Sequence, residues 1–170
     1  MASASDLTVL TALCAGLGSA ALIDMRQRRI PNVVCASTAG VGLALSASGV
    51  SDVTLMSSVA GLMLGLAMML PGHVLGAMGA GDVKLFAAAG TLLGSGRMVP
   101  AFIFMAIAGG VLAVTVAWYR GRIGRTMQLT ARLLARPGKL KPAVESQSEH
   151  NRFSYGPAIA VGCVIAALMR

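Results

Sequence analysis

The chain has 170 residues, of which 56% are hydrophobic and only 12% charged, and its mean hydropathy is +0.77. Soluble domains carry about 25% charged residues, so this composition excludes a water-soluble globule. The net charge of +8 does not indicate nucleic-acid binding, because the basic residues lie between apolar runs and lack interleaved aromatics. The sequence predicts an all-α, polytopic membrane helix bundle with one domain over residues 1–170.

Six apolar runs approach the roughly 20 residues that a helix needs to cross a hydrocarbon core. The expected spans are residues 7–23, 32–47, 53–70, 82–96, 98–119 and 155–169. No basic segment precedes the first run, so we expect it to remain as a helix and not to be a cleaved signal peptide. Pro31 fits the first turn of the second helix, and we expect the third to close at Pro71-Gly72.

The fourth run is less regular than the others, because glycines crowd its start and Asp82 interrupts it. Non-helical backbone at membrane depth is tolerated only where protein buries it or water reaches it. We therefore expect a polar cavity at one membrane face, beside this glycine-rich start.

The basic residues provide a test of the helix count. With six spans, twelve basic residues fall on one side of the membrane and two, Arg97 and Arg170, on the other. Basic loops stay in the cytoplasm, so we expect the N-terminus outside and the long basic loop 120–154 inside. Part of that loop fits either a basic amphipathic helix on anionic headgroups or a solvated basic loop.

Acidic residues are so few that candidates for chemistry can be found by elimination. The complete set is Asp6, Asp24, Asp52, Asp82, Glu145 and Glu149. The expected topology puts Asp6 and Asp52 outside and both glutamates in the polar loop. Asp24 and Asp82 remain, each at a helix end on the cytoplasmic side, and an ionisable residue at membrane depth indicates function because its burial is costly.

Two carboxyl groups in a partly desolvated pocket share a proton, so that one acts as a base and the other as an acid. The ionised aspartate can deprotonate a water that attacks a peptide carbonyl, while the protonated aspartate donates to the oxyanion or leaving amine. This chemistry needs no metal and no cofactor. The absence of a Cβ at Gly79 and Gly81 would let a substrate strand approach Asp82 closely.

Each aspartate also has a structural interpretation. Asp24 stands beside arginines at a helix end and would fit a juxtamembrane carboxylate paired with a neighbour. Asp82 would fit an N-cap that follows a glycine-rich turn. A Cys35–His73 nucleophile pair is a weaker alternative, because neither residue has an evident orienting partner.

Three motifs in order carry a resemblance to a known family. They are Asp24 followed by residues 28–32 (Arg-Arg-Ile-Pro-Asn), residues 79–85 (Gly-Ala-Gly-Asp-Val-Lys-Leu), and residues 155–158 (Tyr-Gly-Pro-Ala). Together they resemble the type IV prepilin peptidases, which are GxGD intramembrane aspartyl proteases. The resemblance extends from about Leu7 to Ala167, and Ser154 stands where family members often have proline.

The resemblance implies cleavage of the basic leader from prepilins or pseudopilins at the cytoplasmic face of the bacterial inner membrane, with Asp24 and Asp82 matching the catalytic aspartates. The expected partners are this substrate, membrane lipids and the pilus assembly or secretion machinery. Larger members carry an N-terminal segment with paired cysteines and also N-methylate the product, and this chain lacks such cysteines. It therefore resembles the short, peptidase-only branch of Flp or tight-adherence pili, and the resemblance does not extend to methylation.

Two other classes of function compete with the protease. A small proton- or cation-coupled transporter would use the same carboxylates, but nearer the middle of the bilayer and often within an internal repeat. A catalytically silent member of a secretion assembly would tolerate alanine at Asp24 or Asp82. A presenilin-like relative would carry its first aspartate on a helix adjacent to the GxGD helix, whereas Asp24 ends the first span.

Overall fold

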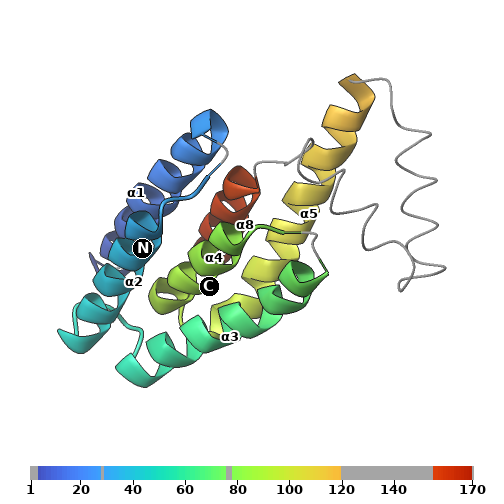
Figure 1. The fold of residues 1–170 in the computed structure, drawn as a ribbon. Coiled ribbons are helices and arrows are strands. Elements are labelled where there is room, and N and C mark those ends of the chain that lie inside the picture. The colour runs from blue at the N-terminus through green and yellow to red at the C-terminus, as the bar shows by residue number, and fades with distance from the viewer. Residues whose placement is uncertain (1–3, 28, 76–77, 120–154, 170) are drawn as a thin grey trace.

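The computed structural model describes residues 4–27, 29–75, 78–119 and 155–169, and in these ranges the secondary structure is helical (Figure 1). The helices are α1 (Ala4–Gln27), α2 (Asn32–Ala47), α3 (Leu55–Val74), α4 (Ala80–Leu93), α5 (Ser95–Tyr119) and α8 (Gly156–Leu168). The expected all-α membrane bundle is thereby confirmed. The basic loop 120–154, with its two interpretations, lies outside the described residues.

Helix length separates the elements into two groups. Three stretches are long and apolar enough to cross a membrane: Ser5–Gln27, Leu55–Val74 and Ser95–Val116. The shorter helices α2, α4 and α8 have 16, 14 and 13 residues. At the rise of an α-helix, α4 is about 21 Å long, shorter than a hydrocarbon core of about 30 Å.

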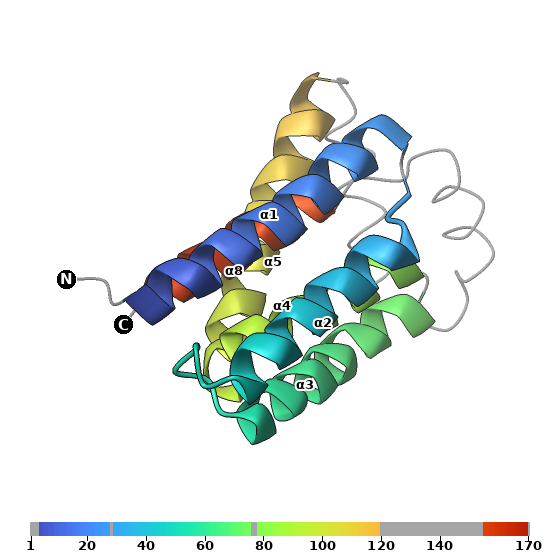
Figure 2. The ribbon, with the colours of Figure 1, turned by 90° about the vertical axis from the view of Figure 1, so that its left-hand side faces the viewer.

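The short helix α4 is the centre of the bundle. Each of the other described helices contacts it, and all residues from Leu85 to Leu93 are buried. Figure 2 shows α1 and α8 side by side on one side of the bundle, with α2 and α3 on the other. An apolar helix that is buried all round must have its polar residues at its ends, which is where Asp82 lies.

Small residues let α3 approach α4 closely. Gly61 faces Gly90 so closely that a Cβ on either glycine would overlap the backbone of the other. One turn along, a Cβ on Gly65 would lie 2.9 Å from the Cα atom of Ala87. Helices in lipid gain little from hydrophobic burial against one another, so this backbone-to-backbone packing is a main source of their association. Gly61 and Gly65 form a Gly-x-x-x-Gly pair, a signal in the sequence that our prediction did not use.

Several helix ends differ from the expected spans: α1 continues to Gln27, α5 begins at Ser95, and the C-terminal ends of α3 and α4 also lie elsewhere. The third helix continues past Pro71 to Val74, because a proline inside a helix removes one N–H donor but keeps a helical φ, and the Leu75 N–H still donates to the Pro71 carbonyl at 3.0 Å. The fourth helix ends at Leu93 instead of reaching residue 96, because Gly94 adopts a φ of 70°. Helix α5 begins immediately after it, at Ser95.

Candidate active site

Asp82 lies in the first turn of α4. Its carboxylate Oδ2 accepts a hydrogen bond from the backbone N–H of Gly79 at 3.1 Å, and its side chain is 8% exposed. Gly79, and not Asp82, is the N-cap residue, and Asp82 reaches back to it from the third helical position. The carboxylate therefore satisfies a backbone donor of the helix start and is also fixed in orientation.

Asp24 lies in the last turns of α1 and is 6% exposed. Its Oδ2 accepts a hydrogen bond from the backbone N–H of Gly156 at 3.1 Å, across 132 positions of sequence. Gly156 is the first residue of α8, so this bond joins the end of the first helix to the start of the last described one. Asp24 is thus held inside the bundle.

Hydrogen bonds across the bundle place the two aspartates at one end. Gly156, the first residue of α8, donates to Asp24 on α1, and Lys84, two positions after Asp82 on α4, donates to Asn32 at the start of α2. The structure therefore brings both carboxyl groups to the same end of the bundle, which we call the aspartate end. It comprises the last turn of α1 and the first turns of α2, α4 and α8.

The glycines of the GxGD motif also pack closely against the chain. A Cβ on Gly81 would lie 3.1 Å from the Cβ of Ile30, and a Cβ on Gly79 would lie 3.2 Å from Asp82 Oδ2. Their small size therefore serves the packing of the site backbone. Both glycines are partly exposed, and the approach of a substrate strand beside them stays a prediction.

The first two sequence motifs contact each other at the aspartate end. Ile30 packs on Gly81, and Lys84 Nζ donates to Asn32 Oδ1 at 3.0 Å. The connection between α1 and α2 thus rests directly on the start of α4. Sequence reasoning did not find Ile30 or Gly156 as site residues, because both contacts depend on how distant helices cross.

The alternative nucleophile pair gains no support from the geometry. The thiol of Cys35 is 3.9 Å from the Gly81 carbonyl oxygen, whereas Nδ1 of His73 is 3.1 Å from the Met78 carbonyl oxygen. In the part of the chain that the structure describes, no hydrogen bond joins Cys35 to His73. Nor do the described residues include a group of three or more His, Cys, Asp or Glu side chains placed to hold a metal ion.

A comparison with models of protein families finds one that matches residues 11–114 of the 170-residue chain, and that family is described as the type IV leader peptidase family. The chain belongs to the type IV leader peptidase family. No curated protein and no solved structure matched the chain. The residues matched to the type IV leader peptidase family include Asp24 and Asp82 but end before α8, so the assignment does not depend on the Tyr155-Gly156 motif.

Membership gives the protein its general activity. A type IV leader peptidase is a membrane protease whose substrate class is the prepilins, and the apolar helices of this chain agree with a membrane location. The family match therefore favours the protease over the two competing functions, the transporter and the catalytically silent structural member.

Proposed function

We propose that Asp24 and Asp82 are the catalytic pair of this leader peptidase and that together they activate the water that cleaves the leader. The observation that carries the proposal is that two buried carboxyl groups, from the last turns of α1 and the first turn of α4, lie at the same end of the bundle. One aspartate in its ionised form takes a proton from water, and the other, protonated, donates to the oxygen or nitrogen of the scissile amide. No cofactor enters this scheme.

Backbone hydrogen bonds support this role. Each carboxylate has its Oδ2 held by a main-chain N–H, from Gly79 for Asp82 and from Gly156 for Asp24. A reacting group that is fixed in this way needs little reorganisation when the substrate binds, and such positioning accounts for a large share of enzymatic rate enhancement.

The distribution of charge supports a cytoplasmic active site. Arg26, Arg29 and Lys84 lie at the aspartate end, while Arg97 lies at the opposite end, in the first turn of α5. By the positive-inside rule, the aspartate end faces the cytoplasm of a bacterial inner membrane and the N-terminus lies outside. We propose the basic leader of Flp-type prepilins or pseudopilins as the substrate and the pilus assembly or secretion machinery as a further partner.

The proposal is tested by leader cleavage of a co-expressed Flp-type prepilin, read as a mobility shift on a gel. Asparagine keeps the size of aspartate and removes its proton chemistry, so Asp24→Asn and Asp82→Asn should each abolish processing, with a loss on the order of 10³-fold or more. Glu145→Gln, which also removes one carboxylate, is the control and should process the prepilin normally. All variants are compared at matched membrane levels.

Processing by both asparagine variants would remove the pair from catalysis and bring the Cys35 alternative back. Cleavage of a secretion-type pseudopilin but not of the Flp-type prepilin would leave the mechanism standing and restrict the substrate to pseudopilins.

A further inference from the structure

A cavity of about 320 Å³ lies at the end of the bundle opposite the aspartate end. It is not the polar cavity that we expected beside the glycine-rich start of α4. Asp6, on its rim, and Asp24 belong to opposite ends of α1 and are about 27 Å apart along the helix axis. The catalytic pair therefore does not use this cavity.

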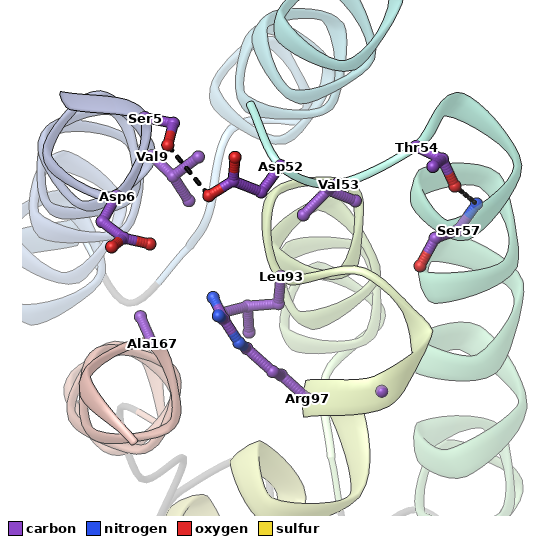
Figure 3. A pocket seen from close by; sticks show the side chains of 11 residues that line it. Ser5, Asp6, Val9, Asp52, Val53, Thr54, Ser57, Leu93, Arg97 and Ala167 are labelled. Carbon is purple, nitrogen blue, oxygen red and sulfur yellow. Dashed lines mark hydrogen bonds between the residues drawn. The ribbon is translucent and has the colours of Figure 1, made fainter. Parts of the chain in front are cut away.

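The lining combines both signs of charge with apolar walls. Figure 3 shows the carboxylates of Asp6 and Asp52 and the guanidinium of Arg97 directed toward one space. Asp52 is held by a hydrogen bond from Ser5 Oγ to its Oδ2 at 2.9 Å. Val9 and Leu93 contribute apolar surface. The three charged side chains carry one net negative charge.

The cavity lies at a membrane boundary. The three stretches able to cross a membrane include Ser5, Leu55 and Ser95 at their ends, and each of these residues lines the cavity or adjoins a residue that does. Backbone N–H groups at the starts of α3 and α5 also face this end, and helix starts favour negative groups such as phosphate. The molecules that occupy such a level in a bilayer are phospholipid headgroups.

We propose that the cavity binds the headgroup of phosphatidylethanolamine. Arg97 would pair with the phosphate, because a guanidinium binds phosphate with two parallel hydrogen bonds. Asp6 and Asp52 would accept hydrogen bonds from the ammonium group, and Val9 and Leu93 would contact the glycerol region. The volume of about 320 Å³ lies at the lower end of the range for small-ligand pockets and suits a small headgroup.

The charges discriminate among phospholipids. Phosphatidylcholine has the same phosphate, but its quaternary ammonium has no N–H to donate to Asp6 and Asp52. Phosphatidylglycerol has the phosphate and no cation, so its charge would add to the net negative charge of the lining. A zwitterion with a primary ammonium satisfies all three charged side chains.

The test uses the full chain purified in detergent and titrated with dioleoyl-phosphatidylethanolamine, dioleoyl-phosphatidylcholine or dioleoyl-phosphatidylglycerol. The ethanolamine lipid should raise the thermal unfolding midpoint, and the other two should not. Arg97→Gln and Asp52→Asn should each weaken the apparent affinity about tenfold, the effect of losing one charge-assisted contact. Arg26→Gln removes a positive charge at the aspartate end and should bind as the wild type does.

A second measurement detects lipid binding directly, so it also applies to a variant whose lower stability obscures the shift in unfolding midpoint. Native mass spectrometry of the folded protein should show a retained ethanolamine lipid on the wild type and its loss on Arg97→Gln. Equal stabilisation by all three lipids, or none by any, would overturn the proposal. Equal stabilisation by soluble phosphoethanolamine would overturn the assignment to a lipid.

Discussion

Gly156 shows how a missing side chain positions a proposed catalytic group. Its N–H donates to Asp24, and a Cβ at this position would lie 3.0 Å from Asp24 Oδ2 and 3.3 Å from the Cα of Ala21. The start of α8 can reach α1 this closely because residue 156 is glycine. A contact made at the backbone leaves no trace in the spacing of polar residues, which explains why it could not be predicted.

We predict that Gly156→Ala lowers the rate of leader cleavage roughly 10- to 100-fold, because the added methyl displaces Asp24 or α8 by a fraction of an ångström. The rate is measured on a purified enzyme with a prepilin in detergent. Gly40→Ala is the matched control, since a Cβ there meets nothing within 4 Å. If both alanine variants cleaved at the wild-type rate, the Gly156–Asp24 contact would have no part in catalysis.

At the scale of elements, α4 is held by close helix crossings as well as by large buried side chains such as Phe86. Gly61 and Gly90 meet at the crossing of α3 with α4, and the buried hydroxyl of Ser58 donates to the Thr91 carbonyl at 2.6 Å beside it. Both interactions suit a helix bundle in lipid, where close packing and internal hydrogen bonds, and not the hydrophobic effect, hold helices together. The position of Asp82 is therefore determined by the α3–α4 contact as well as by its own hydrogen bond.

We predict that Gly61→Val destabilises the protein by about 1–3 kcal/mol or more, because the crossing has no room for a side chain. The measurement is the unfolding midpoint in a titration from mild detergent into dodecyl sulfate. Gly110→Val is the control, because a side chain at position 110 on α5 meets no other atoms. The change in helix propensity from glycine to valine is the same at both positions, so only the packing differs. Equal loss in both variants would contradict the packing explanation.

The sequence predicted the elements to differing degrees. The bounds of α2 were predicted at residues 32–47, because Pro31 and the turn around Gly49 mark them locally. The C-terminal ends of α3 and α4 were not predicted, because we expected Pro71 to end the third helix and Gly94 to lie within the fourth span. The grouping of Asp24 and Asp82 at one end follows from the alternation of helices alone. The contacts that Ile30 and Gly156 make at this end could be found only from the three-dimensional arrangement of the helices.

At the scale of the whole molecule, the orientation in the membrane connects the site to its substrate. We predict that Ser48→Cys, in the α2–α3 connection, reacts with a membrane-impermeant maleimide in intact cells and that Arg29→Cys does not. Both residues are exposed and lie at opposite ends of α2. The background lacks Cys14, Cys35 and Cys163, and lysed cells give the total reactivity. Labelling of Arg29→Cys alone in intact cells would invert the proposed topology.

The shortness of α4 has an electrical consequence. At about 21 Å it is shorter than the surrounding hydrocarbon layer of about 30 Å, and polar groups stand at both of its ends. Where water enters at those ends, the transmembrane voltage falls over this shorter distance, so the local field is steeper than in the lipid beside the protein. Asp82 lies at one edge of that layer and Arg97 at the other. A proton that reaches Asp82 from the water at the same end crosses almost none of that field, so we expect the proteolytic step to be insensitive to the energised state of the membrane.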